Sequence, residues 1–160
     1  FRAPGRPTVI VDYAHTPDAV EQALHALRGQ CRGRLICVFG CGGDRDPGKR
    51  PQMGAVAEAC ADRMVVTSDN PRSEDPNRII DQIRGGFKTD FQQFQIIPDR
   101  EQAIVCAMAS AHPGDSVLIA GKGHEAHQLF DRVSIPFSDR DVVERSLGAR
   151  HPVAASGAMT

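Results

Sequence analysis

The chain has 160 residues, of which 41% are hydrophobic, and this suffices for one buried core but not for two ordinary domains. Its 19 basic and 20 acidic residues leave a formal charge of -1, so the overall balance gives no reason to expect nucleic acid or a membrane surface as a partner. The longest apolar runs have only the length of a strand, and the first residues do not resemble a signal peptide, so we expect a cytoplasmic protein without a membrane span.

Predicted strands and helices alternate along the chain. Strands are expected at short apolar or β-branched runs, and helices where apolar residues recur every three or four positions after a capping residue or a proline. The segment 133–147 predicts one more strand, which could lie antiparallel at a sheet edge, and a last helix capped by Ser138. The earlier strands are predicted at 8–11, 35–39, 64–67, 94–98 and 116–120, and helices are predicted to begin near Pro17, Pro51, Pro76 and Arg100.

This alternation indicates a Rossmann-like α/β domain, with a mostly parallel sheet of about six strands and helices on both faces. We predict that residues 8–150 form this domain. Residues 1–7 would be a linker from a preceding domain, because the chain begins without Met, and 151–160, rich in small residues, would be a disordered tail.

Ligands of such sheets bind at the carboxyl ends of the strands, so the loops that follow the strands are informative. Four of these loops carry charged residues: "DYAHTPD", "GCGGDRDPGKR", "SDNPR" and "GKGHE". We expect all four to lie along one rim of the sheet.

The second loop nearly matches a phosphate-binding loop. From Gly43 it fits G-x-x-x-x-G-K, but Arg50 stands where a Ser or Thr would coordinate Mg²⁺. Asp44 and Asp46 also place two anions inside the would-be phosphate cradle. These residues favour presentation of Arg45, together with Lys49, to a ligand that carries carboxylates.

The third loop, "SDNPR", is held extended or in a turn, since Pro71 disfavours a helical conformation at Asn70. Arg72 offers a planar fork suited to a carboxylate, and Asn70 can both donate and accept hydrogen bonds. A solvated turn before a helix is the alternative interpretation.

The two remaining loops allow two interpretations each. In "GKGHE", Glu125 could bind an ammonium or simply favour a helix start, and His124 could be a general base or a structural histidine. In "DYAHTPD", Asp12 could hold ribose hydroxyls and His15 could face a phosphate, or the turn could serve only to cap a helix.

Five cysteines without a C-x-x-C pair argue against a disulfide framework, since an odd number cannot close one. Cys37 and Cys41 flank the glycine-rich loop without clustered partners, so small buried side chains are a better interpretation than a zinc site. We predict no metal ligands in this chain.

The segments "VDYAHTPD", "FGCGGDRDPGKRPQMG", "TSDNPR" and "LIAGKGHE" closely resemble, in this order and spacing, the C-terminal domain of the Mur ligases, from about Thr8 to Leu147. The resemblance implies a three-domain, ATP-dependent, amide-forming enzyme of peptidoglycan synthesis. Its N-terminal domain would bind the UDP-sugar substrate, its central domain would hold ATP and Mg²⁺, and its C-terminal domain would bring the incoming amino acid. This chain alone would then be inactive and contain no catalytic residue.

Within the family, "DNPR" resembles the mark of the branch that adds meso-2,6-diaminopimelate to a UDP-N-acetylmuramoyl-dipeptide ending in D-glutamate. Carried over by position, the resemblance implies that meso-2,6-diaminopimelate is bound by Arg45, Asp69, Asn70, Pro71, Arg72, Gly121 and Glu125. It also implies that ATP is touched by Asp12, His15 and Lys49.

Three other classes remain as alternatives. A dinucleotide oxidoreductase domain would need a glycine fingerprint that the sequence lacks. A noncatalytic small-ligand module would not need four charged loops along one rim. A folylpolyglutamate synthetase is opposed by "DNPR" together with "GKGHE".

Overall fold

The computed structural model of the chain describes residues 1–88 and 92–148. The elements follow the predicted alternation, and α2 begins two residues before the predicted Pro51. In chain order they are β1 (Thr8–Asp12), α1 (Pro17–Arg28), β2 (Leu35–Phe39), α2 (Lys49–Cys60), β3 (Arg63–Val66), α3 (Pro76–Arg84), β4 (Phe94–Ile96), α4 (Arg100–Ser110), β5 (Ser116–Ala120), β6 (His127–Phe130), β7 (Val133–Pro136) and α5 (Asp139–Gly148).

Side chains just before the helices fix where three of them begin. The hydroxyl of Thr16 accepts a hydrogen bond from the backbone N–H of Ala19 at the start of α1. The carboxylates of Asp75 and Asp99 do the same for α3 and α4. Each cap satisfies a backbone donor that the first turn of a helix leaves without a partner.

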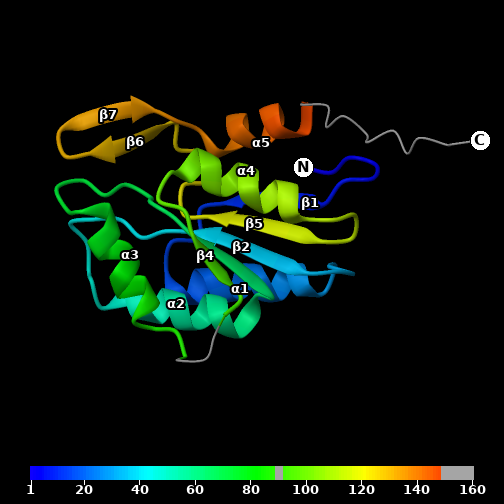
Figure 1. Cartoon of the computed structure of the whole chain (residues 1–160), viewed down its shortest axis with the longest axis horizontal. Coiled ribbons are helices and arrows are strands. Elements are labelled where there is room, and N and C mark those ends of the chain that lie inside the picture. The colour runs from blue at the N-terminus through cyan, green and yellow to red at the C-terminus, as the bar shows by residue number, and fades with distance from the viewer. Residues whose placement is uncertain (89–91, 149–160) are drawn as a thin grey trace, which may run out of the picture.

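Five parallel strands form the main sheet in the order β1, β5, β2, β3, β4 (Figure 1). Three strands, β5, β2 and β3, have neighbours on both sides, and two of them, β2 and β5, are buried at every residue. Continuous burial explains why they are short apolar runs without polar alternation. The predicted Rossmann-like parallel architecture is confirmed.

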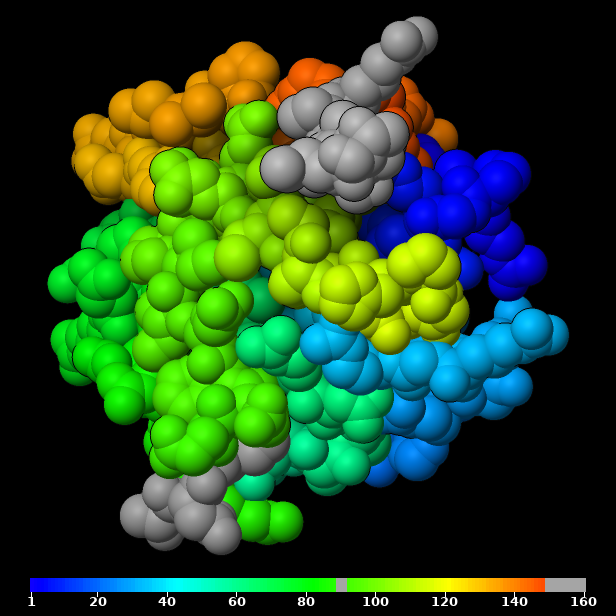
Figure 2. All heavy atoms as spheres, turned by 45° about the vertical axis from the view of Figure 1, so that its right-hand side comes forward, coloured from blue at the N-terminus to red at the C-terminus, as the bar shows by residue number. Residues whose placement is uncertain are grey.

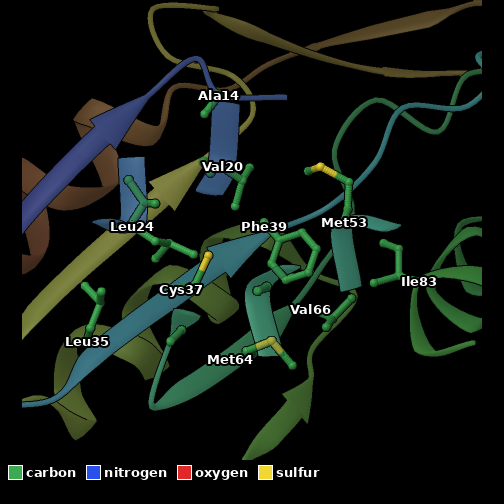
Figure 3. Close-up of a cluster of buried hydrophobic side chains, with 14 of the residues drawn as sticks. Ala14, Val20, Leu24, Leu35, Cys37, Phe39, Met53, Met64, Val66 and Ile83 are labelled. Carbon is green, nitrogen blue, oxygen red and sulfur yellow. The ribbon is translucent and has the colours of Figure 1, made fainter. Parts of the chain in front are cut away.

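Helices cover both faces of the sheet, with α1, α2 and α3 on one side and α4 and α5 on the other (Figure 1). Successive residues of β2 therefore supply different cores, since side chains alternate along a strand. Cys37 and Phe39 pack against the first group of helices, near Leu24 and Met53 (Figure 3), and Val38 packs against the second. Cys37 is buried as predicted, whereas Cys41 is half-buried.

The segment after β5 differs from the prediction. In place of one further strand of the main sheet, β6 and β7 pair antiparallel as a separate hairpin, so the main sheet has five strands rather than about six. The chain turns at Gly121 and Gly123, whose φ angles are +120° and +56°, and this carries the hairpin to the carboxyl edge of the sheet. The orange hairpin stands at one corner of the molecule, away from the blue N-terminal segment (Figure 2).

Residues 1–7 lie beside the first strand. The N-terminal ammonium donates to the Val9 carbonyl at 2.7 Å, and the Val9 N–H donates to the Phe1 carbonyl at 3.0 Å. Their role as a linker remains a prediction, and the predicted tail 151–160 lies outside the described residues. Over the described ranges, no helix combines the length and apolar character needed to cross a bilayer.

Candidate functional site

The four charged loops meet at the carboxyl edge of the sheet. They follow β1, β2, β3 and β5, and parallel strands place all these loops at one edge. A cleft of about 380 Å³ lies between them. The residues predicted for the site that line this cleft are His15, Arg45, Lys49, Asp69, Asn70, Arg72, Gly121 and Glu125.

Two predicted residues are not among the residues that line the cleft. Pro71 is buried and packs closely on Gly43, since a Cβ added to Gly43 would lie 1.8 Å from the Pro71 carbonyl oxygen. Pro71 therefore contributes to the packing of the two loops. Asp12 accepts a hydrogen bond from the Ala14 N–H at 2.7 Å and lines the neighbouring groove instead.

A buried lysine joins two of the predicted residues. Lys122 is fully buried, and its ammonium donates to Asn70 Oδ1 and to Glu125 Oε2, both at 2.9 Å. Asn70 Nδ2 also donates to Glu125 Oε2 at 3.0 Å, and Asn70 Oδ1 accepts from the Leu129 N–H at 3.1 Å. These bonds fix the orientation of the Asn70 amide and of the Glu125 carboxylate.

The same contacts set the charge of Glu125. Partial burial raises the pKa of this carboxyl, but hydrogen bonds from Lys122 and Asn70 outweigh burial and hold the pKa below its ordinary value. Glu125 is therefore an anion at neutral pH, and both bonds fall on Oε2. Its other oxygen, Oε1, can accept hydrogen bonds from a ligand.

Arg72 is held by the glycine-rich loop and by the hairpin. Its φ angle is +53°, an uncommon conformation for a residue with a side chain. Its Nη1 donates to the Gly43 carbonyl at 2.7 Å, while its N–H donates to the Leu129 carbonyl at 3.0 Å. These contacts hold the guanidinium in the cleft, next to Gly42. A Cβ added to Gly42 would lie 2.9 Å from Arg72 Nη1.

Arg50, which breaks the phosphate-loop pattern, has a structural contact. It is 1% exposed and makes a two-pronged ion pair with Glu74, with both N–O distances at 2.8 Å. It also donates to Gln82 at 2.6 Å and to the Gly42 carbonyl at 3.0 Å. A hydrogen bond from Arg50 is the main cause that lowers the pKa of Glu74 to about 2. Arg50 thus connects the glycine-rich loop, through the Gly42 carbonyl, to Gln82 of α3.

The two aspartates of the glycine-rich loop also bind protein groups. Asp44 accepts from the Ser73 hydroxyl at 2.6 Å and from the Ser73 N–H, and these bonds lower the pKa of Asp44. Asp46 accepts from the Gly48 N–H at 2.9 Å. The loop is consequently tied to Ser73, the residue that follows the "DNPR" segment, and both aspartates accept hydrogen bonds from protein groups.

Gly121 permits close contact with Asp69 on the floor of the cleft. A Cβ on Gly121 would lie 2.6 Å from Asp69 Oδ2, and the positive φ also favours glycine. Asp69 Oδ2 lies 4.0 Å from Nη1 of the buried Arg100, which is paired at 2.8 Å with Asp139. The negative charge of the Asp69 carboxylate is therefore partly neutralised by the Arg100 guanidinium.

Arg45 and Lys49 are exposed cations on the wall of the cleft. Arg45 Nη1 donates to the Asp44 carbonyl at 3.1 Å. Because a guanidinium carries five N–H donors, this bond leaves Arg45 able to bind a carboxylate. With Arg72, three cations line the same cleft as the Glu125 anion, an arrangement suited to a zwitterion with more than one carboxylate.

Sequence reasoning missed two residues of the site. Lys122 was not predicted as a site residue, because the residues next to a lysine in the sequence do not show whether the fold buries it. Tyr13 is half-exposed and lines the cleft, with its ring centroid 4.7 Å from that of His15. An aromatic residue in a loop after a strand was a signal that could have identified Tyr13.

Comparison with known families decides the assignment. The family described as "Mur ligase, glutamate ligase domain" matches residues 2–123. The chain belongs to the Mur ligase family. Glu125, in the "GKGHE" loop of this Mur ligase domain, lies two residues beyond the matched range.

Similar proteins give the same picture. The chain is 55% identical over 145 residues to the UDP-N-acetylmuramoyl-L-alanyl-D-glutamate--2,6-diaminopimelate ligase of Synechococcus sp. (strain WH7803), covering 91% of this chain and 29% of that protein. A solved structure with the same enzyme name is 42% identical, with a TM-score of 0.84, covering 92% of this chain and 32% of that one. This Mur ligase domain thus spans about a third of the length of these relatives.

A folylpolyglutamate synthase is a more distant neighbour. The bifunctional folylpolyglutamate synthase/dihydrofolate synthase of Yersinia pestis, solved with AMPPNP and Mn ion, is 22% identical with a TM-score of 0.57, covering 76% of this chain and 27% of that one. At this identity the likeness concerns the fold alone.

Proposed function

We propose that this domain binds the amino-acid substrate of a larger ATP-dependent ligase, which joins meso-2,6-diaminopimelate to UDP-N-acetylmuramoyl-L-alanyl-D-glutamate in cytoplasmic peptidoglycan synthesis. The observation that carries the proposal is the cleft in which Arg45 and Arg72 lie with Glu125. The two relatives above 40% identity, which bear the name of this ligase, support the proposal.

Diaminopimelate has an ammonium and a carboxylate at each end, so one end must be held as a zwitterion while the other amino group reacts. Arg72, aided by Arg45, would bind the distal carboxylate through charge-assisted hydrogen bonds. Glu125 Oε1 and the backbone at Gly121 would accept from the distal ammonium. Because Lys122 fixes the other oxygen of Glu125, the acceptor is oriented before the substrate arrives, which reduces the ordering cost of binding.

Asn70 would have two tasks. One N–H of its amide donates to Glu125, and its oxygen accepts from Lys122 and Leu129. The second N–H of Nδ2 can donate to the substrate carboxylate. Asp69 and Pro71 would support the recognition loop, through the contacts to Gly121 and Gly43 described above.

ATP and Mg²⁺ would be held mainly by another part of the full-length protein. The glycine-rich loop here does not fit a nucleotide phosphate with its cation, because Arg50 stands at the Ser/Thr position and donates to the Gly42 carbonyl within the loop. His15 and Lys49, at the wall of the cleft, and Asp12, beside it, would contact the nucleotide when the full-length protein closes. The domain's own part in the reaction is to position the attacking amino group.

The test is a ligase assay with the full-length protein, in which phosphate release from ATP is followed with different amino acids. We expect a much higher kcat/KM for meso-2,6-diaminopimelate than for L-lysine or L-glutamate. Equal or greater use of L-lysine would overturn the proposed substrate, and use of L-glutamate on a folate acceptor would favour the folylpolyglutamate synthase class.

A further inference from the structure

We propose that Glu21, His25 and Cys60 form a binding site for Zn²⁺ that joins α1 to the end of α2. The ligand atoms of these three side chains all lie within 4.8 Å of one another. His25 Nε2 is 3.8 Å from Glu21 Oε1 and 3.8 Å from Cys60 Sγ. No part of the amino-acid-binding proposal depends on this site.

These separations suit a metal centre. With a metal–sulfur bond of about 2.3 Å and metal–nitrogen and metal–oxygen bonds of about 2.0 Å, the ligand atoms of a tetrahedral zinc site with one sulfur lie roughly 3.3 to 3.5 Å apart. Small rotations of exposed side chains would close the remaining difference. The side chains of His25 and Glu21 are 67% and 51% exposed, so both can move and a cation can reach them.

The donor set favours zinc over harder cations. One sulfur, one imidazole nitrogen and one carboxylate oxygen combine the ligand types that Zn²⁺ takes, whereas Mg²⁺ and Ca²⁺ prefer oxygen alone. Three protein ligands would leave a fourth position for water. Glu21 and His25 are four residues apart and so share one face of α1.

A neighbouring ion pair connects α1 to the end of α2. Arg28, on α1, donates to the Cys60 carbonyl at 3.3 Å and to Asp62 at 2.8 Å. Cys60 is the last residue of α2, and α1 and α2 run side by side beneath the sheet (Figure 1). The backbone positions of the ligands are therefore fixed without a metal, and Zn²⁺ would need to order only the side chains.

The site lies away from the cleft. Cys60 ends α2 shortly before β3 begins, so it is near the amino edge of the sheet, whereas the cleft is at the carboxyl edge. Zinc there would act on the stability of the α1–α2 pair. At a free metal concentration one hundred times the dissociation constant, we expect the midpoint of thermal unfolding to rise by roughly 5 to 10 °C.

The experiment uses the 160-residue chain without a polyhistidine tag, freed of metal with a chelator and titrated with CoCl₂ under reducing conditions. We expect one equivalent of Co²⁺ to bind with a thiolate-to-cobalt charge-transfer band, and ZnCl₂ to displace it. Cys60→Ser should abolish the band, and His25→Ala and Glu21→Gln should each weaken binding at least tenfold.

Cys31→Ser is the matched control, because Cys31 is a half-buried cysteine whose thiol donates to backbone carbonyls elsewhere. This variant should keep the band and the affinity of the parent chain. A band that persists in Cys60→Ser, or affinity unchanged in His25→Ala, would mean adventitious cation binding and would overturn the site. The His25 variant keeps the test decisive if Cys60→Ser fails to fold, since His25 is exposed.

Discussion

The buried ammonium of Lys122 gives the sharpest test of how the site is organised. Lys122→Met keeps most of the aliphatic stem and removes the cation that binds Asn70 Oδ1 and Glu125 Oε2. Removing one partner of a buried pair costs about 3 to 5 kcal/mol, and because the Glu125 side chain remains 26% exposed to water, we expect about 2 to 4 kcal/mol. Urea unfolding of the 160-residue chain at pH 7, followed by circular dichroism, should show a lower midpoint with an unchanged slope.

Lys88→Met is the matched control, since Lys88 is exposed, and its effect should stay within about 0.5 kcal/mol. Glu125→Gln supplies a double-mutant cycle. If Lys122 stabilises the protein through the Glu125 carboxylate, Glu125→Gln should cost less in the Lys122→Met background than alone, with a coupling of about 1 kcal/mol or more. Strict additivity, or a Lys122→Met effect as small as that of Lys88→Met, would refute the reasoning.

Four further predictions concern the full-length enzyme and the domain. Arg72→Ala should lower kcat/KM for diaminopimelate by roughly thirtyfold to a thousandfold, because a charge-assisted pair is lost, and should lower kcat/KM for L-lysine only slightly. Arg63→Ala, at the opposite edge of the sheet, is the control and should change neither value. An equal loss for both amino acids would contradict this role of Arg72. Glu125→Gln should raise the KM for diaminopimelate more than the KM for ATP, and equal rises would point to a structural role. Glu74 has a depressed pKa, so its stabilising effect is present above the ordinary pKa of 4.5 and is lost as the pH falls toward 2. Between about pH 4.5 and 2, the free energy of unfolding, measured by urea titration, should therefore decrease less steeply in Glu74→Gln than in the parent chain. An equally steep decrease in both chains would exclude the Arg50–Glu74 contact as the cause. Finally, the isolated 160-residue chain should fold but form no amide bond from ATP, dipeptide substrate and diaminopimelate, and detectable product would refute the assignment of ATP binding to another domain.

Much of the fold and of the candidate site could be predicted because the relevant signals are local. The apolar runs of β2 and β5 and the caps at Thr16 and Asp99 can be recognised within a few residues of sequence. Once the strands are parallel, their carboxyl ends must meet, so loops more than a hundred residues apart could be assigned to one rim. The convergence of Arg72 and Glu125 on one cleft follows from that rule.

Only the tertiary structure decided which charged groups bind one another. The Arg50–Glu74 pair spans 24 residues, and the bond from Lys122 to Asn70 spans 52, so neither has a periodic signature in the sequence. The hairpin of β6 and β7 was missed because strand pairing depends on where the chain is carried after Gly121, and not on the residues of the strand alone. Burial turned Lys122 from one more charge in a loop into the cation that orients Glu125, because a charge shielded from water interacts strongly only with the partners that the fold places beside it.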